Sequence, residues 1–291
     1  MPFWKKKPKQ STTAKKIASS KPAPKSEPTP QPKNESSKKP KPKAGFRQQD
    51  ARKAFLTTFR RLTYRHRAWD IWRDFVTMLA CSISNAVDKS HFEEREARYM
   101  RIIKKYNKEE QKLFPELAAQ MVMALEDNPE QDFLGDIFME LNLGNESGGQ
   151  FFTPYHVCDL MAKVAMGDNV AQRVKEQGYI TINDPCCGAG ATLIAGIHEA
   201  RKQLEKQNLN YQNHVLVIAQ DIDEVVAMMC YIQLSLLGIA AYIKVGDTFT
   251  EPMIQNDNLE NYWFTPIYFS NVWTMRRTFH MMEELFERGS R

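Results

Sequence analysis

Acidic and glycine residues recur in the second half of the chain, each time directly after a short apolar run. Asp184 precedes a turn containing Gly188 and Gly190, where small residues let a ligand approach the backbone. The turn leads into an apolar helix pattern, whose first N–H groups lack partners within the helix. A carboxylate ahead of the glycines disfavours a phosphate and favours a cationic sulfonium or ammonium group. A dinucleotide fingerprint is excluded because Leu193 stands where its third glycine would be.

Two further acidic residues follow the next two apolar runs. Asp221 is placed to accept hydrogen bonds from both hydroxyls of a ribose. Asp247, with Phe249 close behind it, offers a carboxylate and a ring where an adenine amino group and base face could be held. An Asp at a strand end also commonly caps a turn or helix, but that explains one such residue better than three in order. The three together favour a glycine loop, a ribose contact and a base contact in one site.

These residues need a sheet to bring them together. Short apolar runs alternate with helical patterns after Gly144, which is typical of a parallel sheet flanked by helices. The predicted strands are residues 179–183, 215–219, 241–245 and 267–270. Ligands of open α/β sheets bind at the carboxyl ends of the strands, where the three acidic turns lie.

The chain before this region divides into two parts of different composition. Residues 46–145 carry apolar side chains at steps of three and four, which predicts a helical domain whose aromatic stripe is core. Residues 1–45 hold thirteen lysines and two glutamates, a net charge of +11, which leaves −6 for the rest. With nine of the fifteen prolines and few large apolar residues, this stretch is expected to be a disordered basic tail. It would attract nucleic acid, serve as a solubilising linker, or touch an anionic membrane.

Several classes of protein are disfavoured by composition. No uncharged apolar run approaches the length of a membrane span, and the start of the chain lacks the apolar stretch of a secretory signal, so we expect a cytoplasmic protein. The five cysteines are scattered without a CxxC spacing, which predicts neither a disulfide framework nor a metal site.

Four ordered segments resemble the motif set of the modification subunits of type I restriction-modification systems and related N6-adenine DNA methylases. They are GQFFTP at residues 149–154, DPCCGAG at 184–190, QD at 220–221 and GDT at 246–248. Upstream, DFLGDIF at 132–138 resembles the helix that leads into the cofactor motif of that family. The resemblance covers about residues 130–251 well and the helical region loosely, and the tail has no counterpart.

The resemblance implies a Rossmann-like sheet that binds S-adenosylmethionine (SAM), preceded by the helical domain, with residues 146–291 as the methyltransferase domain. It implies that Phe152, Thr153 and Pro154 line the site, that Asp184, Gly188 and Gly190 contact the methionine part, that Asp221 takes the ribose, and that Asp247 takes the adenine with Phe249 nearby. Cys187 stands where the family commonly has cysteine, and is not expected to be a nucleophile.

The family's catalytic motif, Asn-Pro-Pro-aromatic, is absent. That motif holds the amino group of a flipped adenine with an Asn side chain and a rigid carbonyl, while its aromatic ring stacks on the base. At the corresponding place the chain has FSNVW at 269–273, which makes Asn271 and Trp273 the catalytic candidates. The alternative interpretation is that Asn271 caps a helix and Trp273 is core. One helix follows the fourth predicted strand, whereas the family continues through further strands, so the sheet is expected to be incomplete at its C-terminal side, with an exposed or partner-covered edge.

Two functions follow from these patterns. The first is a SAM-dependent DNA methyltransferase acting on adenine N6, which needs a partner subunit for specificity and uses no metal. The second is a catalytically degenerate relative that binds SAM, DNA or a partner without turnover. Methylation of a protein or small molecule is a third possibility, because SAM motifs do not name the acceptor. DNA contacts would come from basic residues at helical spacing, which could equally form a solvated face. They are Arg47, Arg52, Lys53, Arg60, Arg61, Arg65 and Arg67.

Overall fold

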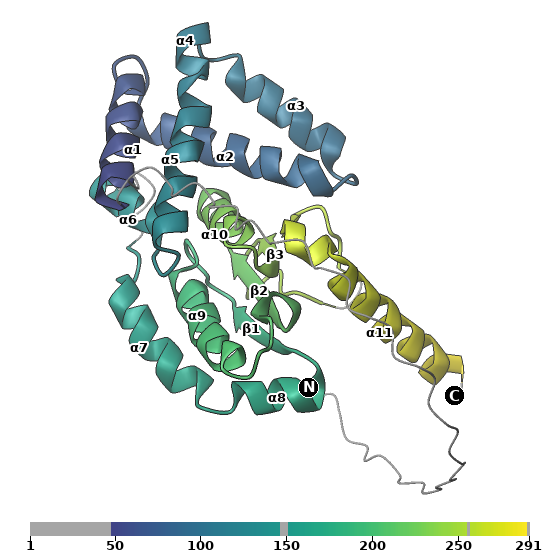
Figure 1. Ribbon diagram of the computed structural model, residues 1–291. Coiled ribbons are helices and arrows are strands. Elements are labelled where there is room, and N and C mark those ends of the chain that lie inside the picture. Colours follow the sequence, from purple (N-terminus) through teal and green to yellow (C-terminus); the bar gives the residue numbers. More distant parts are fainter. Residues whose placement is uncertain (1–47, 146–150, 255–256, 290–291) are drawn as a thin grey trace, which may run out of the picture. The chain divides into compact units, whose positions relative to one another are not determined.

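The computed structural model describes residues 48–145, 151–254 and 257–289. The predicted tail, residues 1–45, and Gly149 and Gln150 of the first motif lie outside these ranges. Up to residue 145 the described chain is helical, which confirms the prediction for this region (Figure 1). Its elements are α1 (Gln48–Leu62), α2 (Ala68–Val87), α3 (Phe92–Ile103), α4 (Lys108–Gln111), α5 (Leu113–Asp127), α6 (Phe133–Glu140) and the 3₁₀ turn η1 (Leu143–Asn145).

An aromatic cluster holds these helices together. Phe55 of α1 packs edge-on against Trp72 and Phe75 of α2, and also against Phe133 of α6, with ring centroids 5.5 to 6.4 Å apart. All four side chains are at most 1% exposed. Burial of such side chains stabilises a fold by about 1.5–3 kcal/mol each. The aromatic stripe expected from the sequence is therefore core.

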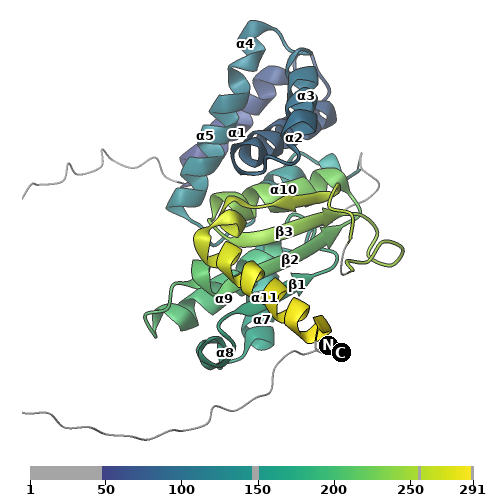
Figure 2. The same ribbon diagram turned by 90° about the vertical axis from the view of Figure 1, so that its right-hand side faces the viewer.

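A mixed four-stranded sheet, in the order β1-β2-β3-β4, follows the helical region. Its elements are α7 (Tyr155–Met166), α8 (Val170–Gln177), β1 (Ile180–Asp184), α9 (Ala191–Glu205), η2 (Tyr211–Asn213), β2 (Val215–Asp221), α10 (Glu224–Leu236), β3 (Ala240–Val245), β4 (Tyr262–Phe264), η3 (Pro266–Phe269) and α11 (Asn271–Gly289). Strands β1 to β3 are parallel, and Ile182, Val217 and Ala241 sit side by side across them. Figure 2 shows the three strands stacked beneath α10. The predicted α/β class and its first three strands are confirmed.

The fourth predicted strand, residues 267–270, is wrong. These residues fall in η3 and the turn after it, and β4 comes earlier, at Tyr262–Phe264. β4 runs antiparallel to β3, and the main-chain N–H of Thr265 donates the last ladder bond to Ala241. Pro266 then ends the strand, because proline has no N–H to donate and suits the first turn of a helix. Among the described strands β1 pairs with β2 alone, so the sheet is incomplete as expected.

A buried arginine ties the helical region to the outer strand of the sheet. Arg95 of α3 donates to a carboxylate oxygen of Asp88 at 3.0 Å, to the hydroxyl of Ser84, and to the main-chain oxygen of Tyr262 at 2.6 Å. Its guanidinium also lies 4.0 Å from the ring centroid of Trp263 in β4. The Arg95 side chain is only 5% exposed, so this charge is compensated almost entirely by protein groups.

The helical region and the sheet lie in one compact unit, in which α2 packs on α10. The domain boundary expected near residue 145 stays a prediction. None of the described helices is both long enough and apolar enough to cross a membrane.

Replacing Arg95 by Met should lower the free energy of unfolding by about 3–5 kcal/mol, because the buried carboxylate of Asp88 would lose its arginine partner and keep only the bonds from Ser90 and His91. A matched control lies one turn along the same helix. Arg98 pairs with Glu224, whose side chain is 46% exposed, so Arg98→Met should cost less than about 1 kcal/mol. Urea denaturation of both variants measures the difference. Equal losses of unfolding free energy in the two variants would show that the pair of Arg95 with Asp88 contributes no more than an exposed ion pair.

Candidate functional site

The three acidic turns predicted from the sequence meet at the carboxyl ends of β1, β2 and β3, and hydrogen bonds join them. The N–H of Gly188 donates to the Asp221 carboxylate at 2.9 Å, and the N–H of Gly246 donates to the Asp221 main-chain oxygen at 2.9 Å. The hydroxyl of Thr248 donates to the main-chain oxygen of Pro185, which closes the third side. The structure therefore brings the glycine loop, Asp221 and the turn that begins at Gly246 into one site.

The glycine loop is shaped by Asp184. Its two carboxylate oxygens accept separate bonds, one from the Cys186 N–H at 3.1 Å and one from the Thr192 hydroxyl at 2.6 Å. Gly190 has a φ of +98°, and a Cβ built there would lie 3.0 Å from the sulfur of Cys230. Glycine is thus required at this position both by the backbone and by the space available. The loop ends at the start of α9, whose first N–H groups face it.

An aromatic side chain from the first motif lies against this loop. Phe152 is half-buried, its ring lies about 3.5 Å from the place a Gly188 Cβ would take, and it packs 5.1 Å from the ring of Phe138. Thr153 and Pro154 follow Phe152 and are exposed, and Pro154 immediately precedes the first residue of α7. The motif therefore reaches the glycine loop through Phe152.

The electrostatics of the site are set by carboxylates. Burial raises the pKa of Asp221 above its ordinary value, although the N–H groups of Asp223 and Gly188 lower it, and the nearby charges of Asp223 and Asp184 raise it further. Such a carboxylate gains by meeting a cation. Asp247 accepts a hydrogen bond from the N–H of Phe249 at 2.8 Å. The Phe249 ring is 92% exposed, so it lies open to solvent beside the site.

A residue that the sequence interpretation missed supports the glycine loop from behind. Gln233 of α10 is fully buried, and its amide nitrogen donates to the Asp132 carboxylate at 2.7 Å and to the main-chain oxygen of Ala189 at 2.9 Å. Its amide oxygen accepts from the N–H of Leu134 at 3.1 Å. Asp132 also accepts from the N–H of Gly135 at 2.9 Å and so caps α6. The available signal was a glutamine inside an otherwise apolar helix, which needs buried partners.

The two catalytic candidates lie elsewhere. Asn271 is exposed at the first turn of α11. Trp273 is 2% exposed, and its indole N–H donates to the main-chain oxygen of Gln212 at 2.8 Å. The Trp273 ring also packs edge-on against Tyr179 at 5.5 Å. Gln212 and Tyr179 precede β2 and β1, so Trp273 packs at the amino ends of the strands and not with the acidic turns.

Neither a reactive cysteine nor a metal site is found among the described residues of the site. Cys187 is buried, and its hydrogen bond with Cys230, together with burial, raises the pKa of its thiol well above the ordinary value. A thiol of this kind stays protonated at neutral pH and is a poor nucleophile. Over the ranges that the structure describes, no group of three or more His, Cys, Asp or Glu side chains gathers as metal ligands.

The family model described as N-6 DNA Methylase matches residues 130–288, which is more than half of the chain. The matched segment begins just before α6 and contains the glycine loop and all three acidic turns. No solved structure matches the chain.

The buried carboxyl of Asp132 should make stability depend on pH. Burial raises its pKa from an ordinary 3.8 to about 6, so the folded state holds more protons than the unfolded state between these values. The free energy of unfolding should therefore fall as pH rises from about 4 to 6, by on the order of 3 kcal/mol. Asp132→Asn keeps an acceptor for Gln233 and should abolish this fall, as measured by urea denaturation at each pH. Parallel pH profiles for both proteins would contradict it.

Proposed function

The chain belongs to the N-6 DNA methylase family, and on this premise we propose that it is a SAM-dependent methyltransferase that modifies N6 of adenine in DNA. The observation that carries the proposal is the meeting of the glycine loop, Asp221 and the Gly246 turn at one edge of the sheet. That edge is where open α/β sheets bind their ligands.

The residues present fit SAM. When bound, SAM supplies a methyl group on a positively charged sulfur, and the three acidic turns offer negative charge where such a ligand would bind. Each carboxylate oxygen of Asp221 accepts one N–H in the structure and retains a second lone pair, which leaves acceptors for the ribose hydroxyls. Gly188 and Gly190 both have a positive φ, which lets the loop turn sharply in front of α9, and Asp247 and Phe249 would hold the adenine.

The acceptor side of the reaction is proposed to need a partner. Asn271 and Trp273 remain the sequence candidates for holding the target adenine, but Trp273 packs with residues at the amino ends of the strands, and Asn271 is exposed two residues before it. This placement favours a second candidate function, in which the chain binds SAM and DNA but leaves the acceptor groups to another subunit or has lost turnover.

The basic residues of the helical region also favour a partner for DNA specificity. Arg52 pairs with Asp136 and Glu140, with a shortest distance of 2.6 Å, and Arg61 and Arg65 lie 3.7 and 3.8 Å from glutamates. Cations that are already paired attract phosphate less strongly than free ones. We therefore propose that a specificity subunit supplies most sequence-specific DNA contacts.

Asp221→Asn should weaken SAM binding by roughly 10-fold to 150-fold, because hydrogen bonds to a charged acceptor contribute about 1.5–3 kcal/mol. Asp159→Asn is the control, since it removes the same charge from α7, where Asp159 pairs with Lys163 outside the site. Calorimetric titration of SAM into each protein gives the affinities. Equal affinities in the two variants would remove Asp221 from the site.

Transfer of a labelled methyl group from SAM to unmethylated DNA separates the two candidate functions. If the chain is a methyltransferase, it transfers the label to DNA when a specificity subunit is added. Asn271→Ala should leave SAM binding unchanged in either case, because Asn271 is exposed at the start of α11, next to Trp273, which packs at the amino ends of the strands. Tight SAM binding with no transfer under any pairing would reject the enzyme and favour the binding protein.

A further inference from the structure

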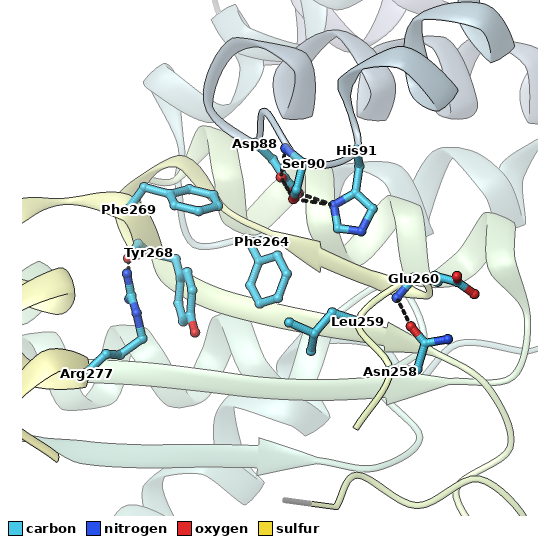
Figure 3. Close-up of a pocket in the computed structure, with 10 residues that line it drawn as sticks. All are labelled: Asp88, Ser90, His91, Asn258, Leu259, Glu260, Phe264, Tyr268, Phe269 and Arg277. Carbon is cyan, nitrogen blue, oxygen red and sulfur yellow. Dashed lines mark hydrogen bonds and ion pairs between the residues drawn. The ribbon is translucent and has the colours of Figure 1, made fainter. Parts of the chain in front are cut away.

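A hollow of about 410 Å³ lies beyond β4, between the α2–α3 turn and η3. It is separate from the glycine loop and Asp221, because none of the residues that line it belongs to that loop or to β2. It lies beside β4, at the edge of the sheet away from β1. Figure 3 shows side chains from the α2–α3 turn, β4, η3 and α11 arranged around this one space. Its volume is in the range of small-molecule sites.

One wall of the hollow is aromatic. Phe264 of β4 lies 4.9 Å from the ring of Tyr268 at an angle of 30°, and Phe269 lies 6.0 Å from Phe264. Phe264 is 9% exposed and Phe269 is 37% exposed, so the wall is anchored at one side and accessible at the other. Such ring surfaces stack on the π-faces of nucleobases with little preference for sequence.

A histidine with a fixed orientation faces this wall. The Nδ1 atom of His91 lies 2.7 Å from the Asp88 carboxylate, which also accepts from Ser90 and from Arg95. Burial raises the pKa of Asp88, but the hydrogen bonds from Ser90 and His91 and the charge of Arg95 outweigh burial and lower it, so Asp88 is ionised at neutral pH. An ionised carboxylate only accepts, so Nδ1 donates its proton to Asp88 and Nε2 is the ring nitrogen left to contact a ligand. Figure 3 shows Nε2 turned toward the hollow.

A cation closes one end of the hollow. Arg277 of α11 lies 4.0 Å from the ring centroid of Tyr268, and it donates to the Tyr268 main-chain oxygen at 2.6 Å and to the Thr274 hydroxyl at 3.2 Å. These contacts fix the plane of the guanidinium and leave further N–H donors for an anion. Two carboxylates also line the hollow: Asp88, which pairs with Arg95, and Glu260, whose side chain is exposed to solvent.

We propose that this hollow binds one unstacked nucleotide of single-stranded DNA. The base stacks on Phe269, whose ring lies edge-on to that of Phe264, an exocyclic amino group donates to His91 Nε2, and the phosphate meets Arg277. A nucleotide in a duplex has both base faces covered, so only an unpaired nucleotide fits. The proposal rests on the proposed function only for the choice of DNA as the polymer, since the contacts themselves do not involve the cofactor site.

Fluorescence anisotropy with a labelled oligo(dC) strand and the full chain tests the proposal, with duplex DNA and free dCMP as competitors. Phe269→Ala should weaken binding of the single strand by roughly 5-fold to 150-fold, because stacking of one base on an aromatic ring contributes that much affinity. Phe269→Leu keeps an apolar side chain and should lose nearly as much. Displacement of the labelled strand by duplex DNA as readily as by unlabelled single strand would overturn the proposal, because the hollow is expected to accept only an unpaired nucleotide.

Two control variants separate a local effect from a general one. Phe279→Ala removes an aromatic ring that is 60% exposed on α11 but does not line the hollow. Arg277→Gln should weaken binding and reduce its salt dependence, whereas Arg101→Gln removes the same charge from the exposed side of α3. Equal affinities of the hollow and control variants would overturn the proposal.

The orientation of His91 predicts a base preference. Oligo(dC) should bind more tightly than oligo(dT), because only cytosine has an amino group to donate to His91 Nε2. Equal affinities would overturn the role given to His91.

The outcome is independent of whether the chain transfers methyl groups. Single-strand binding that depends on Phe269, in a protein that transfers no methyl group, supports the hollow and rejects the enzyme. Methyl transfer by a protein whose single-strand binding does not depend on Phe269 supports the enzyme and rejects the proposal for the hollow.

Discussion

The side-chain amide of Gln233 connects three parts of the molecule that are far apart in sequence. The first part is α10, which carries Gln233. The second is α6, which it contacts at Asp132 and Leu134, and the third is the glycine loop, which it contacts at Ala189. A buried amide is tolerated only when its donors and acceptor are all engaged, so these partners must be present together. The conformation of the glycine loop is therefore determined by the way α6 packs on α10, and not by its local sequence alone.

The sheet brings the proposed cofactor residues together but leaves the two proposed catalytic residues apart from them. Parallel pairing from β1 to β3 places all three acidic turns at one edge, where a cationic nucleoside ligand is expected to bind. Beyond β3 the chain reverses into β4, and Arg95 fixes that strand to the helical region. The segment that carries Asn271 and Trp273 consequently begins near the amino ends of the parallel strands, and the acidic turns lie at their carboxyl ends.

Much of this arrangement can be predicted from the sequence, for identifiable reasons. The apolar runs before Asp221 and Asp247 are mostly buried, and the run before Asp184 alternates between more and less buried positions. Their period and their turn residues are local signals. The fourth strand was misplaced because residues 262–264 and 267–270 are similarly aromatic, and only the partner strand decides between them. Gln233 and the hollow beside β4 were missed for the same reason: their residues come from separate segments and meet only in the folded chain.

The contact between Gln233 and Ala189 also implies thermodynamic reciprocity. Any ligand that selects the present conformation of the glycine loop must, through the same hydrogen bonds, favour the docked position of α6 by an equal free energy. The amide protons of Leu134 and Gly135 would then exchange with solvent more slowly when such a ligand is present. Hydrogen exchange in α6 would thereby show whether a ligand is bound at the glycine loop.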